Sequence, residues 1–303
     1  MFDLFKKKEK SGGWPVPGET DGRQQDCITP HDVSDSSPPD PQEIKDAIRR
    51  KYAEIAISSE GRFEYPTGRA GAEALDYDPV FIHEATASLL KSFCGVGNPF
   101  SLGNIQPGNN VLDIGSGAGF DLYVAKRLTA ESGKVCGIDL TREMVSRARK
   151  NLAESGMNDI EIVHVSSEEI PYNDNTFDTV ISNGVINLSP CKQELFQEIF
   201  RVLKNGGKLQ FADVVLEKEL PGTLAGSLEA WSQWIGGTIP VRDQLDLMEQ
   251  VGFSEVESPG KTGFRTSQFT VGALFKAAKI TWTLIIKVQS RKQKRFFLSF
   301  LSL

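Results

Sequence analysis

Apolar positions follow two alternating spacings along the chain from residue 110 onward. Short apolar runs typical of β-strands are separated by stretches with the apolar period of amphipathic helices. The predicted strands are Val111–Ile114, Lys134–Ile138, Ile160–Val165, Phe177–Ser182 and Lys208–Val215. The helical stretches between them are Phe120–Thr129, Arg142–Glu154 and Lys192–Leu203. Strands that alternate with helices in this way pair in parallel, with helices on both faces of the sheet.

The pattern continues beyond Asn205-Gly206-Gly207, which we expect to end the helix before it. Helical spacing returns over residues 224–234 and 241–251. Two short strands, Ser254–Glu257 and Phe269–Phe275, are then predicted to pair at the edge of the sheet. The expected fold class is α/β, with a doubly wound, mostly parallel seven-stranded sheet and an antiparallel edge strand.

The first hundred residues follow a different pattern. Residues 6–40 hold few large apolar side chains, so we expect a disordered lead. Helices are predicted to start at Asp40-Pro41 and at Asp78-Pro79, where an acid caps the helix and proline takes its first position. Residues 58–77 are predicted to form a loop over a pocket. The expected organisation is a lead (1–40), a helical cover (41–105), a main domain (106–278) and a tail (279–303).

Composition narrows the class of protein. The net charge of −6 argues against nucleic acid as a partner. Four scattered cysteines (27, 94, 136 and 191), with no paired spacing, indicate a reduced, cytoplasmic protein without a metal site. We expect no secretory leader, because the first residues lack its apolar core, and the sequence contains no run of ~18 apolar residues that would span a bilayer.

The tail differs from the rest of the chain. Residues 279–303 hold six Lys or Arg and no acid, beside a cluster of aromatic residues. Two interpretations stay open: contact with an anionic membrane surface, and a loosely packed extension, which we favour. The oligomeric state is not indicated.

The clearest motif is Val111-Leu112-Asp113-Ile114-Gly115-Ser116-Gly117-Ala118-Gly119. An apolar strand leads through a glycine turn into a helix, whose first N–H groups are free to bind a ligand. A dinucleotide motif would need glycine at position 120, which is Phe120, and a phosphate loop would need Lys followed by Ser or Thr. Asp139 ends the next strand, where an acid accepts hydrogen bonds from a ribose diol.

These residues resemble the class I S-adenosylmethionine-dependent methyltransferases. Ser182-Asn183 at the end of the fourth strand and Arg201-Val202-Leu203-Lys204-Asn205-Gly206-Gly207 add to the resemblance. It implies a Rossmann-like fold and S-adenosylmethionine as cofactor. The implied cofactor-binding residues are Asp113, Gly115, Gly117, Gly119, Asp139, Leu140, Met144, Ser166, Ser167 and Asn183.

Three further segments resemble the arsenite methyltransferases: Gly95-Val96-Gly97-Asn98-Pro99, Ile181-Ser182-Asn183-Gly184-Val185-Ile186-Asn187-Leu188 and Trp234-Ile235-Gly236-Gly237. Members of that family hold As(III) with cysteine thiolates, which suit this soft ion. Gly184 and Ile235 stand at two of those positions here, and Ser58–Tyr65 contains no cysteine. Could the cysteines that are present replace these ligands? In one interpretation Cys94 faces the site. Cys136 is interpreted as a core residue, and Cys191 as too far along the chain to replace the missing cysteine at Gly184.

No catalytic residue is identified. Methyl transfer requires an acceptor lone pair held in line with the methyl group, and it needs a base only if the acceptor loses a proton. Candidates by position are Tyr65, Tyr77 and Asp213, while His83 is interpreted as solvent-facing and His164 as structural. Three functions stay open: an arsenite methyltransferase-like enzyme acting on a small molecule, a methyltransferase for an organic acceptor such as a lipid or quinone precursor, and an inactive cofactor-binding partner module.

Overall fold

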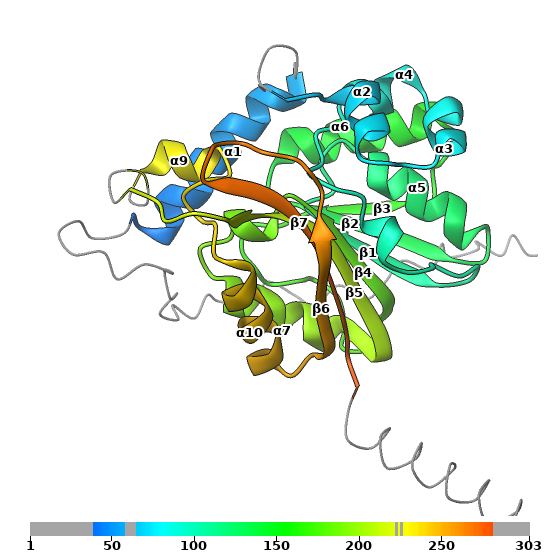
Figure 1. Ribbon diagram of the computed structural model, residues 1–303. Coiled ribbons are helices and arrows are strands. Elements are labelled where there is room, and N and C mark those ends of the chain that lie inside the picture. The colour runs from blue at the N-terminus through cyan, green and yellow to red at the C-terminus, as the bar shows by residue number, and fades with distance from the viewer. Residues whose placement is uncertain (1–38, 58–64, 222–223, 225–226, 281–303) are drawn as a thin grey trace, which may run out of the picture.

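The described residues form one mixed sheet with helices on both faces (Figure 1). The computed structural model describes residues 39–57, 65–221, 224 and 227–280. The strand order is β3-β2-β1-β4-β5-β7-β6. The strands are β1 (Asn110–Ile114), β2 (Lys134–Asp139), β3 (Glu161–His164), β4 (Phe177–Asn183), β5 (Leu203–Leu216), β6 (Ser254–Lys261) and β7 (Thr270–Ala278).

The predicted fold class is confirmed. Strands β1 to β5 are parallel, and β7 is antiparallel to both β5 and β6. The antiparallel strand therefore lies one place inside the edge, which β6 occupies. The order reverses between β1 and β4, and ligands of open α/β sheets bind at such a reversal, beyond the carboxyl ends of the strands.

The helices cover the sheet from two sides. They are α1 (Pro41–Ile57), α2 (Gly68–Ala74), α3 (Pro79–Glu84), α4 (Ala87–Lys91), α5 (Phe120–Thr129), α6 (Arg142–Glu154), α7 (Lys192–Val202), α9 (Leu228–Ser232) and α10 (Val241–Val251), with short 3-10 turns η1 (Pro99–Leu102) and η2 (Ile186–Leu188). Helices α4, α5 and α6 pack on one face, and α7 and α10 on the other. No helix of the described ranges is both long and apolar enough to cross a membrane.

Alternation along the strands explains this layering. In β1, Val111 packs with the α5 and α6 side chains and Leu112 with those of α7 and α10, because successive side chains point to opposite faces. Both side chains are 0% exposed. The near-continuous apolar runs of the sequence therefore correspond to strands buried on both faces.

Three predicted elements differ from the structure. The stretch predicted as a loop over 58–77 contains helix α2, in which Gly71 passes so close to Pro66 that a Cβ there would lie 2.6 Å from the Pro66 carbonyl oxygen. The helix predicted from Asp78 is divided into α3 and α4, because Ala85 is extended. Over the described part of 224–234, only Leu224 and α9 are helical.

Asn205-Gly206-Gly207 lies inside strand β5 and does not end a helix. Helix α7 ends at Val202, three residues earlier. The ammonium group of Lys279 donates hydrogen bonds to the carbonyl oxygens of Arg201 (3.3 Å) and Leu203 (2.8 Å), and a cation at this end of a helix is favourable. Gly206, at φ +86°, donates from its N–H to the Lys279 carbonyl, 2.7 Å away. The two glycines thus connect β5 by backbone hydrogen bonds to Lys279, the residue after β7.

Two regions expected from the sequence, the lead and the tail, lie mostly outside the described residues, which exclude 1–38 and 281–303. The disordered lead, the membrane hypothesis and the domain boundaries therefore stay predictions. Asp40 and Asp78 cap α1 and α3 as expected: each accepts a 2.8 Å hydrogen bond from the backbone N–H two residues on.

The contact between β5 and β7 gives a test of the core. Phe211 is fully buried and stacks on Phe275 with ring centroids 4.8 Å apart. We expect Phe211→Ala to lower the free energy of unfolding by about 3–5 kcal/mol, because it leaves a cavity in a closely packed site. Urea unfolding followed by circular dichroism measures this. Val80→Ala, at a side chain that is 52% exposed, is the control and should cost less than about 0.5 kcal/mol.

Candidate functional site

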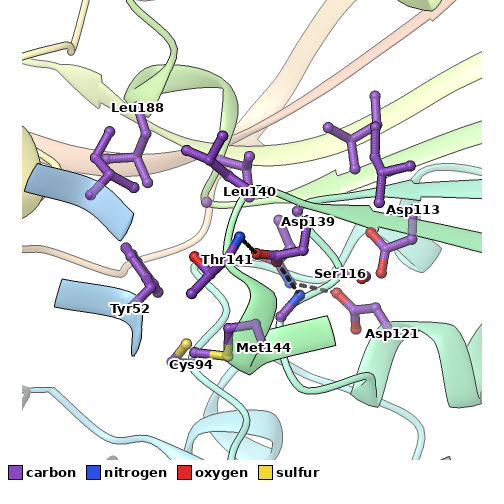
Figure 2. A pocket seen from close by; sticks show the side chains of 18 of the residues that line it. Tyr52, Cys94, Asp113, Ser116, Asp121, Asp139, Leu140, Thr141, Met144 and Leu188 are labelled. Carbon is purple, nitrogen blue, oxygen red and sulfur yellow. Dashed lines mark hydrogen bonds between the residues drawn. The ribbon is translucent and has the colours of Figure 1, made fainter. Parts of the chain in front are cut away.

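One pocket lies beyond the carboxyl ends of β1, β2 and β4, at the reversal of strand order. The glycine loop after β1 forms its floor, and α1 covers it with Lys45, Ile48 and Tyr52. Figure 2 shows Asp113, Ser116 and Asp121 grouped on one side, and Tyr52 and Leu188 on the other. The pocket therefore has an acidic side and an apolar side.

The glycine loop requires its glycines for two separate reasons. Gly117, at φ +49°, has a backbone conformation that side chains disfavour. At Gly115 any side chain is also excluded sterically, since a Cβ there would lie 2.3 Å from Val185 Cγ2. The N–H groups of Gly115 and Ser116 both donate to the Ile138 carbonyl, at 2.8 and 3.0 Å, which ties the loop to β2.

Asp139 at the end of β2 holds the loop from the other side. Its carboxylate accepts hydrogen bonds from the N–H of Gly117 (2.9 Å) and of Thr141 (2.8 Å). Burial raises the pKa of Asp139 to about 6, and these hydrogen bonds oppose the rise. A carboxylate has about four lone-pair sites, so acceptor capacity remains for a ligand hydroxyl.

Asp113 and Ser116 carry polar atoms that lack partners. Asp113 Oδ2 and Ser116 Oγ are buried and have no hydrogen-bond partner in the part of the chain that the structure describes. Burial raises the pKa of Asp113, and the charges of Asp121 and Asp139 raise it further. Unpartnered buried polar atoms are costly, so a polar, positively charged ligand fits this side of the pocket.

Asp121 is the residue that the sequence analysis missed. It lies in the first turn of α5, and its carboxylate accepts hydrogen bonds from the Tyr77 hydroxyl (2.7 Å) and the Asn183 amide (3.0 Å). Burial raises its pKa to about 6, against the lowering effect of both hydrogen bonds. An acid in the first turn after a glycine loop was the available signal, but Tyr77 and Asn183 are distant in sequence.

The Asn183 amide also fixes the Gly95-Val96-Gly97 segment. Its oxygen accepts from the N–H of Val96 (2.8 Å), and its NH₂ donates to the Gly97 carbonyl (2.9 Å). A Cβ at Gly95 would lie 2.4 Å from the Asn183 nitrogen. The glycine is therefore needed for this close approach, which places Cys94 at the pocket.

The other predicted cofactor residues divide into two groups. Those that line the pocket beside the glycines are Asp113, Asp139, Leu140, Met144, Ser167 and Asn183. Ser166 is exposed and is not among the lining residues, and its carbonyl accepts a hydrogen bond from Arg49 (2.9 Å). Direct contact between these side chains and a cofactor stays a prediction.

The cysteines are placed as follows. Cys94 lines the pocket, and burial raises the pKa of its thiol to about 12. Cys136 is a core residue of β2, 1% exposed, as expected. Cys191 is buried before α7 and does not line the pocket, and Cys27 is outside the described residues. Among the described residues, Cys94 is thus the one pocket-lining cysteine.

The remaining candidates by position are also placed. His83 is exposed on α3, and His164 Nε2 lies 3.1 Å from the Leu140 carbonyl oxygen in a structural contact. Tyr77 belongs to the Asp121 network, and Tyr65 stacks on Trp234. Asp213 is buried away from the lining, where it accepts from the Asn187 N–H at 2.7 Å.

Comparison with known families agrees with this geometry. A model described as a methyltransferase domain matches residues 105–275. The chain belongs to this methyltransferase family. Membership confirms the resemblance drawn from the motifs, and S-adenosylmethionine is the cofactor.

Individual relatives show how far the similarity extends. The chain is 33% identical to an arsenite methyltransferase of Halobacterium salinarum over 232 residues. The aligned stretch covers 72% of this chain and 59% of the relative. It is 30% identical over 159 residues to a demethylmenaquinone methyltransferase of Oceanobacillus iheyensis, covering 52% of this chain and 64% of the relative. The chain therefore spans less than two thirds of the length of either relative.

Solved structures support the fold. An arsenic(III) S-adenosylmethionine methyltransferase from Chlamydomonas reinhardtii is similar with a TM-score of 0.51 and 26% identity, over 72% of this chain and 75% of that one. A phosphoethanolamine N-methyltransferase from Haemonchus contortus has a TM-score of 0.55 at 18% identity, over 72% and 61% of the two chains. The second likeness concerns the fold alone.

The raised carboxyl pKa values predict how cofactor binding depends on pH. A cationic sulfonium ligand favours ionised carboxylates, so protonation of Asp121 and Asp139 near pH 6 weakens its binding. We expect the dissociation constant of S-adenosylmethionine to rise about tenfold from pH 7 to pH 5 for each carboxylate that must be ionised. Isothermal titration calorimetry across this range measures it, and a pH-independent affinity would contradict the assignment.

Asp139 itself is tested by substitution. Asp139→Asn removes the charge and one of the two acceptor oxygens, and we expect weaker binding of S-adenosylmethionine by about 10-fold to 100-fold. Asp178→Asn is the matched control, because Asp178 is paired with Lys204 (2.7 Å) and does not line the pocket. The control should bind S-adenosylmethionine as the unmodified protein does.

Proposed function

We propose that this chain transfers a methyl group from S-adenosylmethionine to a small-molecule acceptor. The observation that supports it most is the unpartnered, buried Asp113 carboxylate oxygen beside the glycine loop, in the pocket at the reversal of strand order. When bound, S-adenosylmethionine supplies an electrophilic methyl group on a positively charged sulfur. Asp113 and Asp121 provide negative charge for the cationic donor, and Asp139 accepts hydrogen bonds from its ribose hydroxyls.

The chain's own contribution to the reaction is positioning. Helix α1 covers the pocket, and its Lys45 forms a largely buried ion pair with Glu168 (2.5 Å), 123 residues away in the sequence. Holding an acceptor lone pair in line with a methyl group in a dry site accelerates transfer by removing the entropy cost of the encounter. Since the pocket-lining thiol stays protonated at neutral pH, Cys94 is not a base for this step.

Two acceptor classes are supported by different observations. Similarity to arsenite methyltransferases supports a trivalent arsenical. The lining supports an organic acceptor, because one neutral thiol does not form the set of thiolates that soft As(III) prefers. We favour the organic acceptor on this ground.

A direct assay separates the two. Labelled S-adenosylmethionine is incubated with As(III) and a thiol reductant, and in parallel with an extract fraction of organic small molecules. We expect methylation of an organic compound that is unaffected by Cys94→Ser, and no methylated arsenic. Methylated arsenic that disappears in Cys94→Ser would support the arsenical instead, and cofactor binding without transfer to either would support an inactive partner module.

Gly184 gives a second, independent test of the acceptor. Its φ is +73°, and a Cβ there would lie 3.0 Å from Val96 Cγ1. Gly184→Cys is therefore expected to lower the free energy of unfolding by about 1–2 kcal/mol and to give no arsenic methylation. Gly260→Ala is the comparison, because a Cβ at Gly260 meets nothing within 4 Å. Arsenic methylation by Gly184→Cys would show that the thiolate site needs only one added cysteine.

A further inference from the structure

Aromatic side chains form one wall of the pocket next to Cys94. Trp234 and Tyr52 line the pocket, and Tyr65 stacks on Trp234 with ring centroids 5.7 Å apart and an interplanar angle of 27°. Phe264 packs edge-on against both Tyr65 (4.4 Å) and Trp234 (5.7 Å). We call these four residues the aromatic wall. Because Tyr65 and Phe264 support the indole, Trp234 presents a fixed surface to the pocket.

The backbone of Trp234 is held in a conformation that non-glycine residues rarely adopt. Its φ is +62°, in the left-handed region, directly after α9. Hydrogen bonds from the N–H of Trp234 to Trp231 (3.1 Å) and of Ile235 to Ala230 (2.9 Å) maintain the turn. Strain of this kind persists where the surrounding structure enforces it, and it is frequent at ligand sites.

The indole lies close to Gly184, one of the positions where the arsenite methyltransferases carry a cysteine. Trp234 Cζ2 lies 3.6 Å from the place a Cβ of residue 184 would take, and Val96 lies 3.0 Å from it. The space beside Gly184 is therefore bounded by a tryptophan edge and a valine. This packing favours an apolar molecule over a metalloid ion at the same place.

The side chains of the wall itself and of Cys94 carry no charge at neutral pH. Burial raises the pKa values of Tyr52, Tyr65 and Cys94, so all three remain protonated. Lys51 is close to Cys94, but its ammonium donates to the Ser232 carbonyl (2.7 Å) and does not line the pocket. The acids Asp113 and Asp121 lie on the opposite side (Figure 2). Of the other charged side chains that line the pocket, Lys45 and Glu168 are paired with each other (2.5 Å), and Asp139 is hydrogen-bonded to the glycine loop. A charged acceptor placed against the wall would thus lose its hydration without gaining a charged partner.

We infer that the aromatic wall binds the ring of a flat, uncharged aromatic acceptor that carries a hydroxyl or amino group. This inference rests on the proposed methyl transfer and specifies its acceptor. In the transfer, the sulfur–methyl bond breaks with its electron pair left on sulfur. A lone pair of the acceptor oxygen or nitrogen forms the new bond to the methyl carbon, and the proton of that hydroxyl or amino group passes to water.

The test uses catechol and 2-naphthol as aromatic probes, with As(III) and ethanolamine for comparison. Labelled S-adenosylmethionine measures transfer, and calorimetry measures binding of S-adenosylhomocysteine and of 2-naphthol to the resulting complex. We expect transfer to at least one aromatic probe and none to ethanolamine or As(III). Trp234→Leu is expected to raise KM for the aromatic probe about tenfold, with kcat changed less than about threefold, since stacking is lost and the reacting atoms are not.

A matched pair of variants separates binding from folding. Trp234→Phe keeps a ring in the wall and should raise KM by less than Trp234→Leu. Trp231→Phe removes an indole that is 2% exposed and lines no part of the pocket, so it should lower stability and leave KM unchanged. If Trp234→Leu does not fold, the comparison of the two Phe variants decides the question.

Failure of this inference is distinguishable from failure of the proposed function. If S-adenosylhomocysteine binds but neither aromatic probe binds the complex or accepts a methyl group, the inference is overturned and the cofactor assignment stands. Equal KM values in Trp234→Leu and the unmodified protein would also overturn it. If the folded, unmodified protein binds neither S-adenosylmethionine nor S-adenosylhomocysteine, the proposed function itself is wrong.

Discussion

The hydrogen bonds of one amide, that of Asn183, connect most of the parts of the pocket. This side chain stands at the carboxyl end of β4 and bonds to the backbone of Val96 and Gly97, to Asp121 on α5 and to the Tyr77 hydroxyl. The segment that contains Val96 and Gly97 is thereby fixed against the carboxyl end of β4. Together with the Thr262 hydroxyl, which donates to the Val96 carbonyl (2.6 Å), these bonds place Cys94 beside the glycine loop.

The acidic side of the pocket follows from the same arrangement. Bringing β1, β2 and α5 together puts Asp113, Asp139 and Asp121 in one buried region. Burial raises the pKa of all three carboxyl groups, and the charges of Asp121 and Asp139 raise that of Asp113 further. Asp121 and Asp139 obtain hydrogen bonds that partly offset this cost, whereas one Asp113 oxygen obtains none. A cation bound here would favour the ionised form of these carboxyl groups, so the acidic side of the pocket suits a positively charged ligand.

The two sides of the pocket are built differently. We call the side beside the glycine loop, where we propose that S-adenosylmethionine binds, the donor side, and the side next to Trp234 and α1, where we propose that the acceptor binds, the acceptor side. The donor side is built from backbone turns and acids within the sheet, and the sequence around it matches the methyltransferase family closely enough to name it. The acceptor side is built from α1, the turn after α9 and the segment before β1, which meet only in the folded chain. The indole of Trp234 and the side chain of Val96 bound the space beside Gly184.

The sequence by itself determined the strands, the helix starts at Asp40 and Asp78, the glycine loop and the acid at Asp139. These depend on local periodicity, on capping groups close in sequence and on glycines whose backbone angles are set by the turn. Only the tertiary structure decided the Asp121 network, the position of Trp234 and the end of α7, which Lys279 caps from 77 residues beyond Val202. In each of these the partners are distant along the chain, and their contact is a product of the strand order. Local spacing carries no signal of such a contact. For that reason the sequence predicted the glycine loop and its acid, but not the side of the pocket that Trp234 and α1 form.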